Sequence, residues 1–220
     1  VDYLADMVWM SFITNKNFSC ASNIYPSYFF SKKNLHISWG KGFTLYGKLS
    51  PKFIKSSPSS EEIRFLIKSN YYDFIVYPSI RRFDRYLGLA SKLMGKNRII
   101  AIDGEDDKNI SWHAKYTTYF KRELTNKAYE KGIKPISFFL PENVLKDINS
   151  KLNHESDKKY FLSPCDPRDK ATYIYKDEKS YYQQYNDSYF GFTMMKGGWD
   201  CLRHYEIIAS GSLPYFSDLD

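Results

Sequence analysis

The sequence of 220 residues contains no long apolar run and few cysteines. A membrane-spanning helix needs about 20 consecutive apolar residues, and with a mean hydropathy of −0.53 this sequence offers no such stretch. The three cysteines, Cys20, Cys165 and Cys201, form no C-x-x-C pair. Their number and spacing argue against a disulfide framework and a structural zinc site, and they indicate a reducing compartment. We therefore expect a cytoplasmic protein.

Targeting signals and nucleotide-binding signatures are also missing. No signal peptide or transit sequence opens the chain. The glycine-rich stretch 39–47 is no Walker sequence, because no Lys-Ser/Thr follows at the required spacing. The first residue is Val1, and residues 1–13 already predict a helix where a nucleotide-binding α/β fold opens with a strand. We therefore expect the sequence to be part of a longer chain.

The charge is only mildly unbalanced, with a net charge of +7 and a pI near 9.0. The basic residues are scattered, and dense pairs such as Arg81-Arg82 and Lys121-Arg122 lie far apart in the sequence. A nucleic-acid binder normally gathers its charge into a stripe or an arm. An anionic small ligand, an acidic polymer or the inner face of a membrane fits this charge as well, so polynucleotide binding is the weaker interpretation.

The sequence does contain alternating strand and helix patterns. The predicted order is 61–69 (helix), 73–78 (strand), 86–94 (helix), 98–103 (strand), 117–120 (strand), 123–131 (helix) and 135–140 (strand). Such alternation predicts a parallel sheet with helices on its faces.

A polar and charged run at 142–159 predicts a boundary between two units, which we place at 1–150 and 151–220. The second unit then reads strand 160–164, helix 178–186, strand 189–193, a glycine turn, a helix and strand 213–216. These elements make only half of a mononucleotide-binding unit. We therefore expect an α/β protein of two Rossmann-like units, of which the second is incomplete.

The glycine turn Gly197-Gly198 and the helix after it carry the strongest functional signal. Asp200 is the predicted N-cap, and Gly211 stands where the helix should end. Arg203 and Glu206 lie three residues apart and so share one side of the helix. A glycine turn before a helix N-terminus suits a phosphate, an arginine can bind phosphate oxygens, and a carboxylate can accept from ribose hydroxyls. A capped amphipathic helix with a solvent-facing Arg–Glu pair fits the same spacing equally well.

Three short blocks together resemble the donor-nucleotide segment of GT-B glycosyltransferases, and are most similar to the spore-coat-like and exostosin-like groups. They are Gly197-Gly198-Trp199-Asp200, Arg203-His204-Tyr205-Glu206 and Gly211-Ser212-Leu213-Pro214. The resemblance covers residues 164–216. It implies an enzyme of polysaccharide biosynthesis that transfers a sugar from a nucleotide-diphosphate sugar to a glycan, a lipid-linked acceptor or another hydroxyl acceptor.

The same resemblance implies the site residues and the absence of a metal ion. Glu206 is expected to contact the ribose, the loop and Arg203 the diphosphate, and Lys196 the leaving group. Such cations stabilise the leaving diphosphate directly, so no metal and no cofactor beside the sugar donor is expected. The residues expected at the donor are Lys196, Gly197, Gly198, Trp199, Arg203, His204 and Glu206.

The acidic turn 103–107 leaves the carboxyl end of the predicted strand 98–103. In open α/β sheets ligands bind outside this end of the strands. Asp103, Glu105 and Asp106 are therefore candidates for the base that takes a proton from the acceptor hydroxyl, with His113 next. A solvated turn without function is an equally good interpretation. A third interpretation is that two of the carboxylates bind a divalent cation.

Two other functions remain open from the sequence. One is a non-catalytic α/β domain that binds a ligand or partner within a larger assembly. The other is a phosphatase- or receiver-like protein that uses the acidic turn with Mg²⁺.

Overall fold

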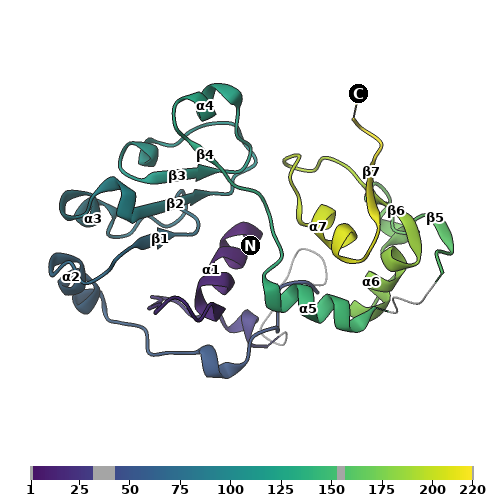
Figure 1. Cartoon of the computed structure of the whole chain (residues 1–220), viewed down its shortest axis with the longest axis horizontal. Helices are drawn as coiled ribbons and strands as arrows, with labels where there is room; N and C mark the ends of the chain where they lie inside the picture. Colours follow the sequence, from purple (N-terminus) through teal and green to yellow (C-terminus); the bar gives the residue numbers. More distant parts are fainter. Residues whose placement is uncertain (1, 32–42, 153–156, 220) are drawn as a thin grey trace. The chain divides into compact units, whose positions relative to one another are not determined.

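The computed structural model describes residues 2–31, 43–152 and 157–219, so residues 39–42 of the glycine-rich stretch 39–47 lie outside it. The chain is a mixed α/β protein with one parallel sheet of four strands and one of three, which confirms this part of the expected fold class. It divides into two compact units (Figure 1). Unit 1 comprises residues 1–25 and 52–138, and unit 2 comprises residues 26–51 and 139–220. The boundary placed after residue 150 falls inside helix α5 (Glu142–Lys151).

Unit 1 is built on the four-stranded sheet, whose strands follow one another in sequence order and are all parallel. Ala101 of the second strand lies in register between Tyr77 of the first and Tyr119 of the third. Its elements are α1 (Tyr3–Thr14), α2 (Ser60–Lys68), β1 (Ile75–Tyr77), α3 (Leu87–Leu93), η4 (Lys96–Arg98), β2 (Ile99–Asp103), η5 (Trp112–Lys115), β3 (Thr118–Lys121), α4 (Asn126–Glu130) and β4 (Lys134–Pro135). The 3₁₀ helix η3 (Pro51–Phe53) precedes α2.

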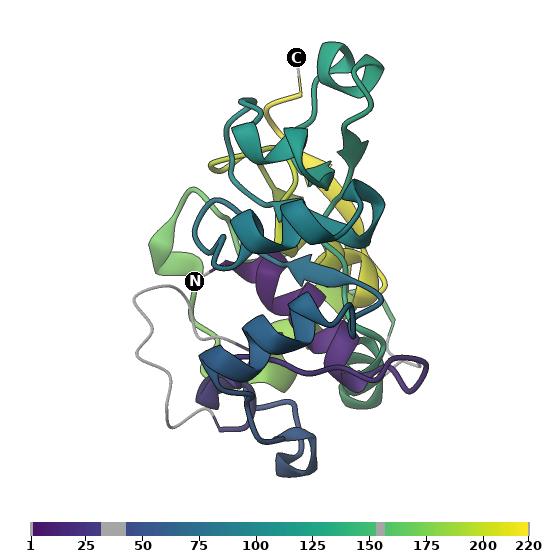
Figure 2. The same ribbon diagram turned by 90° about the vertical axis from the view of Figure 1, so that its left-hand side faces the viewer.

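Helices α2 and α3 pack against this sheet in one apolar cluster, and Figure 2 shows α3 in front of the strands and α2 below β1. Ile67 of α2 and Ala90 of α3 are buried against Ile99 and Ala101 of β2. Burial of these apolar side chains is the main favourable contribution to packing the helices on the sheet. The strand predicted at 135–140 is wrong in length. The paired residues of β4 are Lys134 and Pro135, and the N–H of Ile136 then donates to the carbonyl of Lys121 of β3 at 3.2 Å.

Unit 2 is built on the three-stranded sheet, in which all strands are parallel and β6 is central. Its elements are η1 (Ser27–Phe29), α5, β5 (Tyr160–Leu162), η6 (Lys170–Thr172), α6 (Glu178–Asn186), β6 (Ser188–Thr193), α7 (Leu202–Ala209) and β7 (Leu213–Phe216). Strand β6 and helix α7 pack closely at Gly191. A Cβ at Gly191 would lie 2.5 Å from Cγ2 of Ile207.

The polar run predicted as a boundary is instead partly helical. The run forms α5, because Val144 and Ile148 lie four residues apart on one face of the helix and both side chains are fully buried. Sequence reasoning was misled by the charged residues, which occupy the other face. An example is the exposed Lys146–Glu142 pair.

The early segment 26–51 belongs to unit 2 although the sequence places it far from the rest of that unit. The ring of Phe43 packs against the ring of Tyr181 of α6, with ring centroids 5.6 Å apart. The ammonium of Lys48 pairs with Asp147 of α5 and Glu178 of α6. An aromatic contact and a buried ion pair therefore hold the segment in place.

Candidate functional site

The glycine turn lies directly after the carboxyl end of β6, the central strand of the sheet of unit 2. The backbone N–H of Lys196 donates to the carbonyl of Gly198 at 3.2 Å and closes the turn. The helix after it begins one residue later than predicted, so Asp200 as its N-cap is wrong. The N-cap is Cys201, which makes no side-chain cap. The carboxylate of Asp200 instead accepts from the hydroxyl of Tyr205 at 2.8 Å.

Arg203 is anchored on one side and has an unused donor on the other. Its Nη2 donates to the hydroxyl of Tyr173 at 2.5 Å, and the guanidinium lies 5.5 Å from the centre of that ring. Its Nε is buried and has no hydrogen-bond partner among the described residues. A buried donor without an acceptor costs about 1–3 kcal/mol, so an anionic oxygen bound there would remove that cost.

Glu206 lies in the interior of unit 2 and is only 7% exposed. One carboxylate oxygen accepts from the hydroxyl of Thr44 and the other from the hydroxyl of Tyr181 at 2.7 Å. Tyr182 in turn donates to Thr44 at 3.0 Å. Burial raises the pKa of the Glu206 carboxyl, although these hydrogen bonds and Arg203 partly offset the rise. A ribose hydroxyl therefore reaches Glu206 only where it displaces Thr44 or Tyr181.

The remaining residues expected at the donor differ in exposure. Trp199 is 41% exposed beside the turn. The ammonium of Lys196 donates to the carbonyl of Pro167 at 3.0 Å. His204 is half-buried, with its Nε2 3.1 Å from the sulfur of Cys201, and burial lowers the pKa of its imidazole. The structure therefore places Trp199 at the surface, whereas Lys196 and His204 have partners within the unit.

In unit 1, Asp103 ends β2 and is fully buried among cations. Its Oδ2 accepts from Nε of Arg81 at 2.9 Å and from the hydroxyl of Tyr119 at 2.5 Å. Its Oδ1 accepts from the backbone N–H of Glu105 at 3.1 Å and lies 3.4 Å from the ammonium of Lys121. Both oxygens are thus engaged within the fold, which is the arrangement of a structural carboxylate.

The other acids of the turn are more accessible, and each is paired with an arginine. Glu105 has a side chain 30% exposed and accepts from Nε of Arg82 at 2.8 Å. Asp106 has a side chain 55% exposed and pairs with Arg122. A hollow of about 160 Å³, lined in part by these two acids and their two arginines, lies beside the turn. Of the three acids expected as the base, Glu105 and Asp106 are therefore the ones that a second molecule can reach.

Sequence reasoning did not foresee that the basic pairs meet the acidic turn. Arg81-Arg82 follow β1, the acidic turn 103–107 follows β2, and Lys121-Arg122 stand at the end of β3. Parallel strands place all three at the same edge of the sheet. The signal was present, because Lys121-Arg122 come directly after the predicted strand 117–120 and Arg81-Arg82 follow closely on the predicted strand 73–78.

His113 is a buried, partnered residue. Its Nδ1 lies 2.6 Å from the hydroxyl of Ser111, and its Nε2 lies 3.3 Å from Oδ2 of Asp84. The indole of Trp112 stacks on the imidazole, with centroids 4.0 Å apart. These contacts are typical of a histidine that packs within a fold.

Among the described residues, no group of three or more His, Cys, Asp or Glu side chains is placed to hold a metal ion. None of the described helices has the length and apolar character needed to cross a membrane. No family model, curated protein or solved structure matches the chain.

Proposed function

We propose that the chain is a glycosyltransferase that transfers a sugar from a nucleotide-diphosphate sugar to a hydroxyl of a glycan or lipid-linked acceptor. The observation that carries the proposal is the place of the segment 196–203. It leaves the carboxyl end of the central strand of a parallel sheet and leads into a helix. Ligands of open α/β sheets bind at this end of the strands, and phosphates bind at helix N-termini.

The donor diphosphate would bind on the glycine turn and Arg203. The unpartnered Nε of Arg203 supplies one donor, and its contact with Tyr173 keeps the guanidinium from rotating away. The ammonium of Lys196, which donates to the carbonyl of Pro167 in the structure, would move from there to the leaving phosphate. These two cations stabilise the charge that develops on the diphosphate, so the proposal needs no metal ion and no cofactor.

The base for the acceptor hydroxyl would be Glu105 or Asp106. Their carboxylates line the hollow beside the acidic turn, whereas the oxygens of Asp103 are engaged inside unit 1. Removal of the true base should lower turnover by roughly 10²–10⁴ and leave donor affinity almost unchanged. The variants Glu105→Gln and Asp106→Asn, each assayed for donor affinity and turnover, separate the two candidates. Wild-type turnover in both would exclude Glu105 and Asp106 as the base.

Calorimetric titration of the intact chain with a panel of nucleotide-diphosphate sugars tests the donor site. Arg203→Ala should weaken donor binding by about tenfold to a hundredfold, the value of a hydrogen bond to a charged group. Arg64→Ala, which removes an exposed arginine of α2 in unit 1, should leave the affinity unchanged. Addition of a chelator should have no effect. A chain that neither binds nor hydrolyses any member of the panel would contradict the proposal.

The runner-up is a non-catalytic α/β domain that binds a ligand or partner in a larger assembly. It is favoured by the fact that Asp103 and Glu206, expected to contact acceptor and donor, both have partners within the fold for both oxygens. Donor binding without transfer or hydrolysis, whichever acceptor is supplied, would favour this function over the first.

A further inference from the structure

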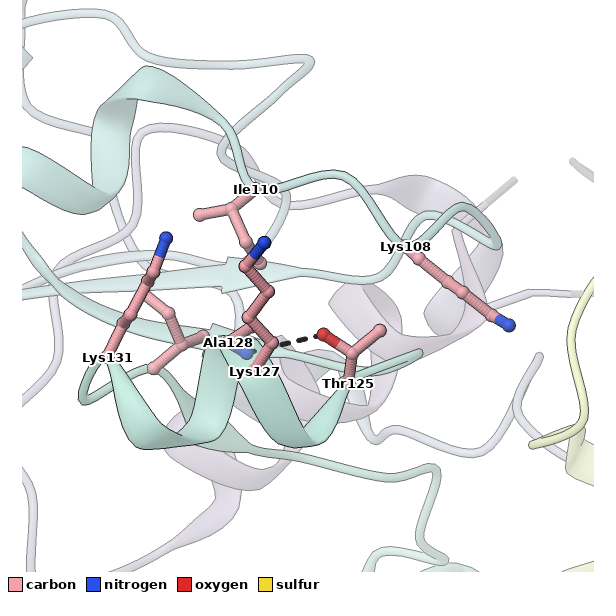
Figure 3. Close-up of a pocket in the computed structure, with 7 residues that line it drawn as sticks. Lys108, Ile110, Thr125, Lys127, Ala128 and Lys131 are labelled. Carbon is pink, nitrogen blue, oxygen red and sulfur yellow. Dashed lines mark hydrogen bonds between the residues drawn. The ribbon is translucent and has the colours of Figure 1, made fainter.

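A second hollow, of about 330 Å³, lies in unit 1 between α4 and the loop that precedes η5 (Figure 3). None of the residues expected at the donor or as the base lines it. Its volume is at the lower end of the range of about 300–1,000 Å³ found for small-molecule sites. The hollow is therefore large enough for a small organic ligand.

The charge around this hollow is uniformly positive. Three of its seven lining residues are lysines, and none carries a carboxylate. Lys127 and Lys131 rise from the region of α4 toward Ile110, whereas the ammonium of Lys108 lies at the opposite end (Figure 3). None of the three is joined to an acid in the part of the chain that the structure describes. Lys127 and Lys131 stand four residues apart, where like charges destabilise a helix, so an anion between them would relieve their repulsion.

The rest of the lining is apolar, with one hydroxyl. Ala128 is buried, Ile133 is half-buried and Ile110 is 37% exposed. The Oγ1 of Thr125 accepts from the backbone N–H of Ala128 at 3.3 Å, so its own proton is left to donate to a ligand. The hollow thus offers cations and a hydroxyl donor beside an apolar surface.

We propose that this hollow binds a small organic phosphate, in which a phosphate group is attached to a compact apolar or aromatic body. The phosphate would accept from Lys127, Lys131 and the hydroxyl of Thr125, and the body would pack on Ile110 and Ala128. A phosphate monoester carries about −1.5 to −2 charges at pH 7 and so balances two ammonium groups. A monocarboxylate balances only one.

Calorimetric titration of the intact chain with phenyl phosphate tests the proposal. Separate titrations with inorganic phosphate and with phenol test the two halves of that ligand. Phenyl phosphate should bind saturably and more tightly than inorganic phosphate, phenol should not bind, and rising salt should weaken the binding. Changing both lysines, Lys127→Gln with Lys131→Gln, should weaken it at least about tenfold. Ile110→Ser should weaken phenyl phosphate and leave inorganic phosphate unchanged.

The matched control removes the same charge elsewhere in unit 1, by Lys68→Gln with Lys92→Gln on α2 and α3. Both lysines are exposed, and neither lines the hollow. This variant should bind phenyl phosphate as the wild type does. Absence of saturable binding to the wild type overturns the proposal. Equal losses in the two double variants overturn it as well, because they would show attraction to the net charge of the protein alone.

Discussion

Two buried carboxylates, Asp103 and Glu206, lie in opposite surroundings. Asp103 is 1% exposed and accepts directly from Arg81, with the ammonium of Lys121 3.4 Å away. Glu206 is 7% exposed and, among the residues that the structure describes, accepts only from hydroxyls, whereas Arg203 acts on it through space. A buried charge is stable where a hydrogen-bonded cation compensates it, and is disfavoured where neutral groups alone surround it. The two residues should therefore respond in opposite ways to loss of their charge.

Asp103→Asn should lower the free energy of unfolding by about 3–5 kcal/mol, because it leaves the cations of Arg81 and Lys121 without their buried partner. Denaturant unfolding measures this. Asp106→Asn is the control, since the exposed side chain of Asp106 should contribute no more than about 1 kcal/mol. If Asp103→Asn were as stable as the wild type, Asp103 would not be structural and would again be a candidate for the base.

Glu206→Gln should change how stability depends on pH. The folded protein raises the pKa of this carboxyl above its ordinary value of 4.5, so the folded state holds the proton more tightly than the unfolded state. This group therefore contributes stability below pH 4.5, and the contribution is lost as the pH rises through the folded pKa. Relative to Glu206→Gln, the wild type should gain stability as the pH falls from 7 toward 4.5.

Thermal unfolding of both proteins across this pH range tests the prediction, with Glu61→Gln in the exposed first turn of α2 as the control for loss of one charge. A constant difference between wild type and Glu206→Gln would contradict it. Donor affinity of the same variant is a separate measurement. A loss of about 1.5–3 kcal/mol there would show that Glu206 also contacts the ribose.

At the scale of elements, the contact between β6 and α7 determines where the glycine turn is held. Gly191→Ala should destabilise the protein by about 1–3 kcal/mol, because the new Cβ would overlap Ile207 and force the strand and helix apart. Denaturant unfolding measures the loss. Gly88→Ala on α3 is the matched control, since its Cβ would meet nothing within 4 Å. The control should be neutral or stabilising. Equal effects of the two changes would contradict close packing at Gly191.

Element types could be predicted from the sequence wherever the apolar pattern was clean. The helix at 178–186 and the strand at 213–216 were predicted with the bounds that the structure shows. Helix α5 was missed because two buried residues in ten are a weak signal among charges. The start of α7 was misplaced because Asp200, a good capping residue, hydrogen-bonds to Tyr205 instead. The local preference of a side chain for capping a helix is overridden where a tertiary partner competes for the same side chain.

The candidate site was less predictable than the fold. The sequence identified the acidic turn and the segment 196–206 but could not show which of their side chains are buried. Glu206 meets Thr44, 162 residues earlier in the sequence. No local pattern reports a contact over such a distance. The exposure of Glu105 and Asp106, compared with the burial of Asp103, likewise depends on the cations that adjacent strands supply.

At the scale of the whole molecule, residues 26–51 are required to complete unit 2. Tyr46 is buried in this unit, and Lys48 pairs with α5 and α6. A fragment of residues 139–220 should therefore lack fixed tertiary structure when expressed alone, with poorly dispersed amide resonances. Addition of a peptide of residues 26–51 should restore dispersion, whereas the same peptide with Tyr46→Ser and Lys48→Gln should not. A fragment 139–220 that is well ordered by itself would contradict this role.

The chain passes between the two units three times, at residues 25–26, 51–52 and 138–139. During synthesis, the last residue of unit 1 therefore leaves the ribosome while unit 2 has only its first 26 residues. Unit 1 can fold at that stage, but the hydrogen bond between Thr44 and Glu206 can form only after residue 206 has been synthesised. Closing so long a loop adds little to the equilibrium cost, which grows only with the logarithm of loop length, but it slows folding. A nascent chain stalled between residues 138 and 206 thus exposes the aromatic segment around Tyr46, which makes this interval of translation the one in which the protein most needs a chaperone.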